Sequence, residues 1–331
     1  MNTEPLGVHR YETSVDPPAK VLVLLAAHDG TLFLREQVAS VLAQEGVSVR
    51  VLISVDVSSD GTESLADTLA REDSRVRCLP HGSAFGGAAP NFYRLIREGD
   101  LQGVSHVALC DQDDVWHTDK LSRAIAAIAR EGVDAYSSNV VVWAPDGTQA
   151  LLRKAQPQRR FDHLFSSAGP GCTYVLTRDA MARFAEWLRR HPDAEQRVEY
   201  HDWLVYAWVR TGGGRWFIDP EPSMKYRQHG ANQLGANVGA RGAVARLRAL
   251  NDGWFRRQVL AVADALLDHD ERPIALLREN RLRSVSKLWL VAPELRRSRK
   301  EALLMCAALT VSAVTRPHAS PSPDERGDLQ Q

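Results

Sequence analysis

Apolar runs alternate with amphipathic segments over the first half of the chain. Runs at residues 21–27, 47–55, 76–79 and 107–110 predict strands covered on both faces. After the first run, Phe33, Val38 and Leu42 recur at helical spacing and predict a helix. A polar turn after the second run and Pro90 after the third mark further helix starts. This alternation predicts an α/β protein with a mostly parallel sheet and helices on both faces.

The second half of the chain changes character along its length. Apolar residues predict a strand over 135–143 and another over 174–176, with a polar hairpin at 145–147 between them. From about residue 240 the pattern is helical without strands. We therefore expect a flexible N-terminus at 1–19, an α/β domain at 20–239, a helical extension at 240–316 and a disordered tail at 317–331.

The fourth apolar run ends abruptly in three carboxylates, Asp111, Asp113 and Asp114. Like charges packed this tightly repel one another, so they persist most easily where a divalent cation neutralises them. Carboxylates at the end of a strand suit Mg²⁺ or Mn²⁺ that also holds a diphosphate. The alternative interpretation is an acidic turn that caps the helix predicted to follow.

Polar residues also follow the first two predicted strands, at Asp29 and Asp56. Ligands of open parallel sheets bind outside the carboxyl ends of the strands, so these residues and the three carboxylates predict a nucleotide-sized site. The sequence contains neither a GxGxxG after the first strand nor a GxxxxGK[ST] motif. This argues against a dinucleotide-dependent dehydrogenase and a P-loop NTPase, and it favours a metal-bridged diphosphate.

Composition narrows the class of protein. Lys plus Arg and Asp plus Glu both number 41 among 331 residues, so no global charge indicates a nucleic-acid partner. The four cysteines are scattered without a CxxC pair, which argues against a zinc ribbon or a disulfide framework and favours a reducing, cytoplasmic compartment. Residues 1–18 lack the apolar core of a secretory signal, and no apolar run is long enough to span a bilayer.

Several short motifs occur in a characteristic order between residues 21 and 235. They are Leu24–Gly30, Asp56–Thr62, Asn91-Phe92, Asp111–Trp116 with Lys120-Leu121, Gly171–Thr173, His201–Trp203 and Tyr226–His229. In this order the chain resembles the family 2 glycosyltransferases of the Rossmann-like GT-A fold, within them the bacterial rhamnosyltransferase-like branch. The resemblance implies an inverting, metal-dependent transfer from a dTDP- or UDP-linked sugar. Rhamnose or another deoxysugar would then pass to a polysaccharide or lipid-linked glycan of the cell surface.

The resemblance also implies a set of metal ligands. Asp113 matches the metal-binding carboxylate of the family, Asp114 is a second candidate ligand, and Asp111 lies near the ribose or the metal. His229 is a further candidate ligand, whereas an isolated histidine would more often be a plain loop residue. Because imidazole suits Mn²⁺ better than Mg²⁺, we expect Mn²⁺, with Mg²⁺ as the alternative.

On the acceptor side, Asp202 resembles the base that removes a proton from the acceptor hydroxyl. A plain helix N-cap is the alternative for this residue. By the same resemblance His201 and Trp203 shape the acceptor pocket, where the indole offers an apolar face to a sugar ring. The turn of Gly171, Cys172 and Thr173 is expected to let the backbone approach donor or acceptor closely.

On the donor side, Asp56 resembles the carboxylate that hydrogen-bonds the nucleotide base, with Ala27 and Asp29 lining the same end. Asn91 at a helix start either faces the diphosphate or caps its helix. The sequence departs from the family pattern around these residues. Val55 and Val57 replace an aspartate and a glycine, and His28-Asp29 replaces an aromatic-asparagine pair. These changes leave the identity of the base open.

Basic residues gather between Arg278 and Lys300 around apolar ones that include Trp289. Such a basic amphipathic helix can lie in an anionic membrane interface, or it can pack on the catalytic domain with a solvated basic face. The apolar segment at 302–314 is short for a membrane span, so a packed or re-entrant helix is expected there. Peripheral membrane contact would suit a lipid-linked acceptor.

Two other functions compete with a glycosyltransferase. A sugar-nucleotidyl transferase would carry a glycine-rich, basic phosphate loop near the N-terminus, and none is present. A non-catalytic module that binds carbohydrate or nucleotide sugar would not need the carboxylates, Asp202 and His229 together.

Overall fold

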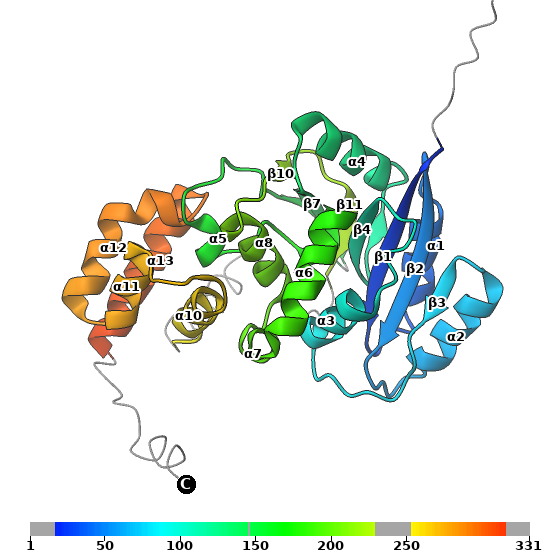
Figure 1. Ribbon diagram of the computed structural model, residues 1–331, viewed down its shortest axis with the longest axis horizontal. Coiled ribbons are helices and arrows are strands. Elements are labelled where there is room, and N and C mark those ends of the chain that lie inside the picture. Colours follow the sequence, from blue (N-terminus) through cyan, green and yellow to red (C-terminus); the bar gives the residue numbers. More distant parts are fainter. Residues whose placement is uncertain (1–16, 145, 229–252, 316–331) are drawn as a thin grey trace, which may run out of the picture.

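The computed structural model describes residues 17–144, 146–228 and 253–315. Within these residues a seven-stranded sheet of order β10-β6-β9-β4-β1-β2-β3 forms the centre (Figure 1). Its strands are β1 Ala19–Ala27, β2 Val47–Val55, β3 Val76–Cys78, β4 His106–Asp111, β6 Ala135–Ser138, β9 Val175–Thr177 and β10 Trp216–Asp219. Only β9 runs antiparallel to its neighbours in this sheet. The predicted α/β class with a mostly parallel sheet is confirmed.

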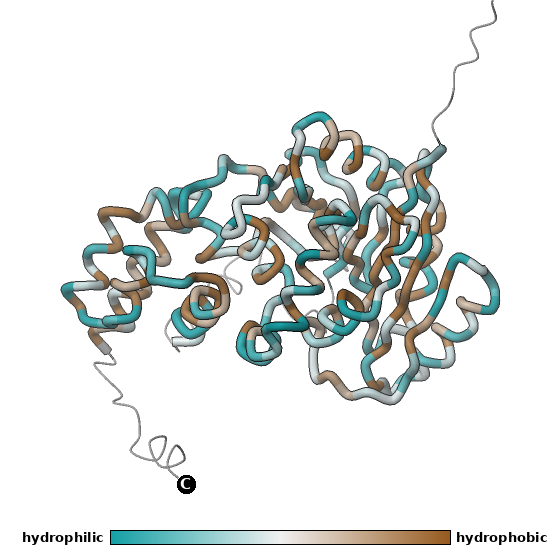
Figure 2. Tube along the Cα trace, in the orientation of Figure 1, coloured by the Kyte–Doolittle hydropathy of each residue, from teal (hydrophilic) through white to brown (hydrophobic). Residues whose placement is uncertain are grey.

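Side chains of β1 alternate between two hydrophobic cores, one on each face of the sheet. Val21, Val23 and Leu25 join α1, α2 and α4, whereas Leu22 and Leu24 join α3, α6 and α8. Because both sides are covered, β1 is apolar from Val21 to Ala27, and Figure 2 shows hydrophobic residues along the central strands. The helices are α1 Leu34–Leu42, α2 Thr62–Glu72, α3 Ala88–Glu98, α4 Lys120–Glu131, α5 Asp162–Phe165, α6 Arg178–Arg190, α7 Pro192–Arg197 and α8 His201–Thr211, with a 3-10 turn η1 at Gly171–Thr173.

The strand predicted over 135–143 is in fact two strands that belong to different sheets. After β6, the Asn139 N–H donates to the Asp219 carbonyl at 2.9 Å, and the Asn139 Oδ1 accepts the Lys154 N–H at 2.6 Å. These bonds end the first ladder and redirect the chain into β7. A second sheet of order β5-β11-β7-β8 follows from β5 Val115–Trp116, β7 Val140–Trp143, β8 Gln149–Leu152 and β11 Met224–Arg227. The antiparallel pairing of β7 with β8 confirms the predicted hairpin.

The helices α10 Trp254–Leu266, α11 Arg272–Glu279, α12 Leu282–Leu295 and α13 Arg299–Thr315 form the C-terminal part, beyond α5 and α8 and away from β3 (Figure 1). Residues 253–315 contain helices without strands, as expected. A single basic helix over 278–300 is wrong, because Asn280 adopts a φ of 49° between α11 and α12, and Arg296 and Arg297 lie in the linker to α13. Among the described residues, no helix combines the length and apolar character that crossing a membrane requires.

Candidate functional site

Three carboxylates converge where β4 ends, at the same edge of the sheet as the carboxyl ends of β1 and β2. Asp114 is 1% exposed and Asp113 is 8% exposed, while Asp111 is half-buried. Cys172 of η1 is buried beside them, and ligand atoms of Asp111, Asp114 and Cys172 all lie within 4.8 Å of one another. The main chain therefore brings two of the predicted acidic residues and one residue of the predicted glycine turn into one cluster.

Burial and mutual repulsion raise the pKa values of two carboxyl groups in this cluster. Burial, followed by the charges of Asp113 and Asp111, raises the pKa of Asp114 well above its usual range. Burial and Asp113 also raise the pKa of Asp111 to about 7. One Asp114 oxygen accepts the Arg227 N–H at 3.1 Å, and within the described residues the other is buried with only the Cys172 thiol as a possible donor. Because the donor set is dominated by carboxylate oxygens, these residues fit a divalent cation of the Mg²⁺ or Mn²⁺ type.

Lys120 lies next to this cluster at the start of α4. Its side chain is fully buried, and its ammonium group has no hydrogen-bond partner in the part of the chain that the structure describes, but it lies 4.1 Å from the centre of the Trp116 ring. Burial lowers the pKa of Lys120 to about 8, and nearby Cys172 and Asp114 partly oppose that shift. Lys120 therefore interacts with Asp114 through its charge, without a direct hydrogen bond to a carboxylate of the described residues.

The end of β1 is fastened to the end of β4 by one side chain. The Gln112 amide donates to the His28 carbonyl at 2.7 Å and accepts the His28 N–H at 2.8 Å. A Cβ at Gly30 would lie 2.2 Å from Gln112 Oε1, so only glycine allows this bridge. The sequence motif at the end of β1 is therefore explained by close packing against the acidic loop.

Asn91 and Asp29 occupy different positions at the same edge. Asn91 is buried and its amide donates to the Ser54 carbonyl at 3.0 Å and the Ala27 carbonyl at 3.3 Å, which joins the ends of β1 and β2. Gly87 flanks the start of α3, so Asn91 is not its N-cap, and among the described residues the Asn91 Oδ1 is buried without a partner. Asp29 is exposed, has a φ of 43° and accepts the Ser59 N–H at 2.7 Å.

The carboxylate of Asp56 holds the loop that follows β3. It accepts the N–H groups of Phe85 at 2.7 Å and Gly86 at 3.0 Å, and the Asp56 N–H itself donates to the Ala27 carbonyl at 2.8 Å. The residue expected to contact the nucleotide base thus joins the loop after β3 to the carboxyl end of β1.

Asp202 faces the acidic cluster from the first turn of α8. It lies close enough that its charge contributes to the raised pKa of Asp111. Burial raises the pKa of Asp202 itself to about 6, against the lowering effect of bonds from the Trp203 N–H and the Ser167 side chain. The residue that flanks the start of α8 is Tyr200, so Asp202 is not the N-cap. The alternative interpretation of Asp202 as a cap is therefore wrong.

The turn at η1 packs directly against α8. A Cβ at Gly171 would lie 2.5 Å from His201 Nε2 and 3.2 Å from Asp202 Cβ, so the observed close approach is to these side chains. His201 is buried, stacks on Phe92 at 3.9 Å between ring centres, and has its pKa lowered to about 3 by burial. Neutral His201 and Gly171 together fix the position of Asp202. Thr173 is buried and donates through its hydroxyl to the Pro170 carbonyl at 2.7 Å.

Trp203 does not offer its ring to an acceptor, contrary to the expectation from sequence. The side chain is 5% exposed, its indole N–H donates to the His163 carbonyl at 3.0 Å, and its ring stacks on Phe255. Adjacent residues of an α-helix point in directions about 100° apart, so Trp203 does not share the direction of Asp202 and packs between α8 and α10. His229, the remaining predicted ligand, lies outside the described residues.

A buried ion-pair network supports Asp202 from the C-terminal linker, and the sequence analysis missed it. The carboxylate of Asp162 is fully buried and accepts hydrogen bonds from Arg297 at 2.8 Å, Tyr206 at 2.9 Å and Arg210 at 3.4 Å. Arg297 also donates to the Ser167 carbonyl at 2.7 Å, and the Ser167 side chain bonds Asp202. The partners are 135 residues apart in sequence, so no local pattern indicated them.

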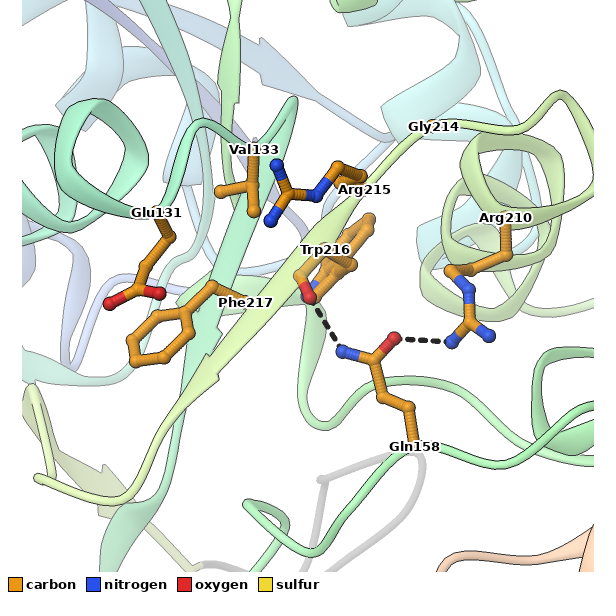
Figure 3. Close-up of a pocket in the computed structure, with 8 residues that line it drawn as sticks. All are labelled: Glu131, Val133, Gln158, Arg210, Gly214, Arg215, Trp216 and Phe217. Atoms are coloured by element: carbon orange, nitrogen blue, oxygen red, sulfur yellow. Dashed lines mark hydrogen bonds between the residues drawn. The ribbon is translucent and has the colours of Figure 1, made fainter.

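The pocket in Figure 3 lies at the opposite edge of the sheet. It is lined by Glu131, Val133, Gln158, Arg210, Gly214, Arg215, Trp216 and Phe217. Trp216 begins β10, which runs parallel to β6 and, through two antiparallel pairings, to β4. The pocket is therefore remote from the carboxyl end of β4, and it carries none of the clustered carboxylates.

Comparisons with known proteins give a consistent classification. The profile of "Glycosyl transferase family 2" matches residues 23–190. The chain is 38% identical over 245 residues to the dTDP-rhamnosyl transferase RfbG of Shigella flexneri, which covers 74% of this chain and 85% of that protein. It is 25% identical over 230 residues to the succinoglycan biosynthesis protein ExoO of Rhizobium meliloti, which covers 64% and 62% of the two chains.

Solved structures share the fold at low sequence identity. Staphylococcus aureus TarS 1–349 superposes with a TM-score of 0.53 at 13% identity and covers 89% of this chain and 81% of its own. The mannosyltransferase PcManGT from Pyrobaculum calidifontis, solved with GDP-Man and Mn²⁺, has a TM-score of 0.50 at 16% identity, with 92% and 77% covered. The arrangement of helices around the mostly parallel sheet is thus one that solved glycosyltransferase chains also have.

Proposed function

The chain belongs to glycosyl transferase family 2, where it is a rhamnosyltransferase-like enzyme, and we propose that it catalyses a metal-dependent transfer with inversion at the anomeric carbon. The observation that carries this proposal is the buried cluster of Asp111 and Asp114, with Asp202 close enough to perturb it. A sugar-nucleotidyl transferase and a non-catalytic module are set aside by the family membership.

Asp111, Asp113 and Asp114 would hold the divalent cation. The buried Asp114 oxygen that accepts no N–H within the described residues supports this assignment, and Arg227, two residues before His229, already donates its N–H to the other oxygen. When bound, the cation neutralises charge on the departing diphosphate as a Lewis acid. We propose Mn²⁺ as the natural ion, with Mg²⁺ as an alternative, in line with the Mn²⁺ complex of the structural relative.

Asp202 is the proposed base. Its carboxylate would take the proton of the acceptor hydroxyl while that oxygen attacks the anomeric carbon from the face opposite the leaving group. Burial raises the pKa of Asp202 to about 6, which is closer to pH 7 than the usual pKa of an aspartate. The carboxyl group is still ionised at pH 7. Ser167 and the neighbouring Lys154 favour the ionised form, so the site maintains a base of moderate strength.

For the donor we propose a dTDP-linked deoxysugar, with rhamnose as the first choice because the relative RfbG is a dTDP-rhamnosyl transferase. A UDP-linked sugar is the alternative. Asp56, Asp29 and Ala27 would line the base and ribose end, since all three lie where β1 and β2 end. The acceptor would be a growing polysaccharide or a lipid-linked glycan of the cell surface.

The C-terminal helices support peripheral contact with the inner face of the cell membrane. Exposed apolar side chains occur on both α12 and α13, namely Leu282, Trp289, Leu290, Leu303, Leu304, Val311 and Val314. Exposed basic residues lie on the same two helices at Arg283, Lys287, Arg299 and Lys300. Apolar insertion combined with attraction to anionic lipid is the basis of interfacial binding. Co-sedimentation with anionic vesicles that is reversed by salt tests this contact.

The experiment for the reaction is a thermal-shift panel of nucleoside diphosphates with and without Mn²⁺, followed by donor hydrolysis and transfer assays. Binding raises the melting temperature only for a ligand that the folded state recognises. We expect a metal-dependent shift with dTDP or UDP, and loss of donor turnover in Asp113→Ala. Asp119→Ala is the matched control, because Asp119 is an exposed aspartate at the start of α4. Equal turnover in the Asp113→Ala variant and the control would refute the proposal.

A further inference from the structure

A second cluster of metal-type ligands lies at the outer end of the same sheet edge. It contains Asp67 of α2, Cys78 at the end of β3 and His81 in the following loop, with ligand atoms that all lie within 4.8 Å of one another. His81 Nε2 is 3.0 Å from Asp67 Oδ1. Three strand spacings separate β3 from β4, which is about 14 Å. This cluster is therefore separate from the acidic cluster of the proposed reaction.

An ordinary ion pair explains only part of this arrangement. The contact between Asp67 and His81 engages one imidazole nitrogen, Nε2, while Nδ1 is buried with no hydrogen-bond partner among the described residues. The Cys78 thiol is half-buried next to the pair, where burial and the charge of Asp67 raise its pKa to about 11. The ion pair leaves the Cys78 thiol unused, although its sulfur lies within 4.8 Å of the ligand atoms of Asp67 and His81. A ligand that engages sulfur, nitrogen and oxygen together would use all three residues.

We propose that Asp67, Cys78 and His81 bind Zn²⁺, with water in the fourth position. Sulfur and imidazole ligands select zinc over Mg²⁺ or Mn²⁺, for which oxygen ligands are preferred. Zinc ligands lie about 2.0 to 2.3 Å from the ion, so a tetrahedral site places them roughly 3 to 4 Å apart. The 3.0 Å separation of His81 Nε2 and Asp67 Oδ1 is close to that value, and the Cys78 sulfur at the end of β3 lies within 4.8 Å of the ligand atoms of both residues.

The ion would fix the loop that follows β3 against α2. The other end of this loop donates the N–H groups of Phe85 and Gly86 to Asp56, and the Pro80 carbonyl accepts from Arg94 at 2.8 Å. Zinc would therefore order the loop that holds Asp56 at the donor edge. This consequence rests on the proposed function, whereas the metal site itself does not.

Cobalt substitution of the purified full chain tests the site, because thiolate-bound Co²⁺ gives a charge-transfer band in the near ultraviolet. The titration is done with Mn²⁺ in excess, which occupies oxygen-rich sites. We expect a band at one equivalent of Co²⁺ that Zn²⁺ removes. Cys78→Ser and His81→Ala should abolish the band, and Asp67→Asn should weaken Co²⁺ binding.

Cys172→Ser is the matched control, because it removes the thiol of the acidic cluster and should leave the band intact. Absence of the band in the wild-type chain, its persistence in Cys78→Ser, or its loss in Cys172→Ser would overturn the assignment. Circular dichroism of each variant shows whether the fold is kept. Loss of the band in both His81→Ala and Cys78→Ser, with the fold intact, then reports loss of a ligand.

Zinc should also slow amide exchange at Phe85 and Gly86 in the wild type but not in Cys78→Ser. Equal exchange with and without zinc would refute the ordering of the loop. None of these measurements depends on transfer activity, so the zinc site and the proposed reaction can fail independently.

Discussion

Two buried aspartates in this chain have opposite surroundings. Asp162 is fully buried and is bonded by Arg297, Arg210 and Tyr206. Asp114 is 1% exposed, yet it receives a backbone N–H and has Asp111 and Asp113 as neighbours. A buried charge is tolerated when it is paired and hydrogen-bonded. Asp162 is therefore neutralised by basic residues of the protein itself, whereas within the described residues no arginine or lysine side chain bonds the Asp114 carboxylate, as the proposed cation site requires.

Asp114→Asn should give the largest effect and should separate activity from stability. Because folding raises the pKa of Asp114, its ionised form destabilises the metal-free folded state at neutral pH. Asparagine removes that charge, so the melting temperature of the chelated protein should rise. Loss of a metal ligand should lower kcat/KM by about 10³-fold, equivalent to several kcal/mol of transition-state stabilisation.

The measurement compares melting curves of wild type and Asp114→Asn in chelator and in Mn²⁺. Mn²⁺ should stabilise the wild type and leave the variant unchanged. A variant that is less stable in chelator would show that Asp114, like Asp162, is already compensated by the protein.

Arg297→Met should give the next largest effect, here on stability. Removing one partner of a buried ion pair leaves an uncompensated charge and costs about 3 to 5 kcal/mol. Arg297 and Asp162 are both almost fully buried, and Arg297 also bonds the Ser167 carbonyl beneath Asp202. Urea unfolding should therefore show a lower midpoint, and kcat should fall because the base loses support.

Arg35→Met is the matched control for this substitution, since the Arg35 to Glu72 pair at 2.6 Å is on the surface. Its unfolding midpoint should equal that of the wild type. If both arginine variants unfold at the same urea concentration, the buried pair stabilises the fold no more than the surface pair. Asp162 would then not depend on Arg297 for its stability.

The pH dependence of the reaction should reflect Asp202. The pKa of Asp202 is raised to about 6, and the base must be ionised to accept a proton. At saturating Mn²⁺, kcat should therefore fall about tenfold per pH unit below pH 6 and level off above it. The free energy of unfolding should change in the opposite direction. Because folding raises the pKa of Asp202, its ionisation makes the folded state less stable as the pH rises from about 4 to 6. If the residual kcat of Asp202→Asn falls with decreasing pH just as that of the wild type does, a group other than Asp202 causes the fall.

The sequence predicted the sheet and its acidic edge because both are local signals. Apolar runs predicted the positions of β1, β2 and β4, and the carboxylates that follow β4 predicted the cluster. The pairing of Asp162 with Arg297 could not be predicted, since it joins residues in distant elements. Trp203 was placed in the acceptor pocket because the sequence does not reveal which face of α8 is covered by α10. The split of 135–143 depends on contacts of Asn139 with residues that lie far along the chain.

The smallest effect should come from Lys120→Met, which asks whether Asp114 already has a counter-charge. Lys120 is fully buried near Asp114, but within the described residues its ammonium makes no hydrogen bond and contacts the Trp116 ring. Methionine preserves the volume and the contact with the ring. It also removes a buried charge whose desolvation no hydrogen bond offsets, and this gain balances the lost attraction to Asp114. We expect urea unfolding to change by at most about 1 kcal/mol. A loss as large as that of Arg297→Met would identify Lys120 as the partner of Asp114 and would make the two buried aspartates alike.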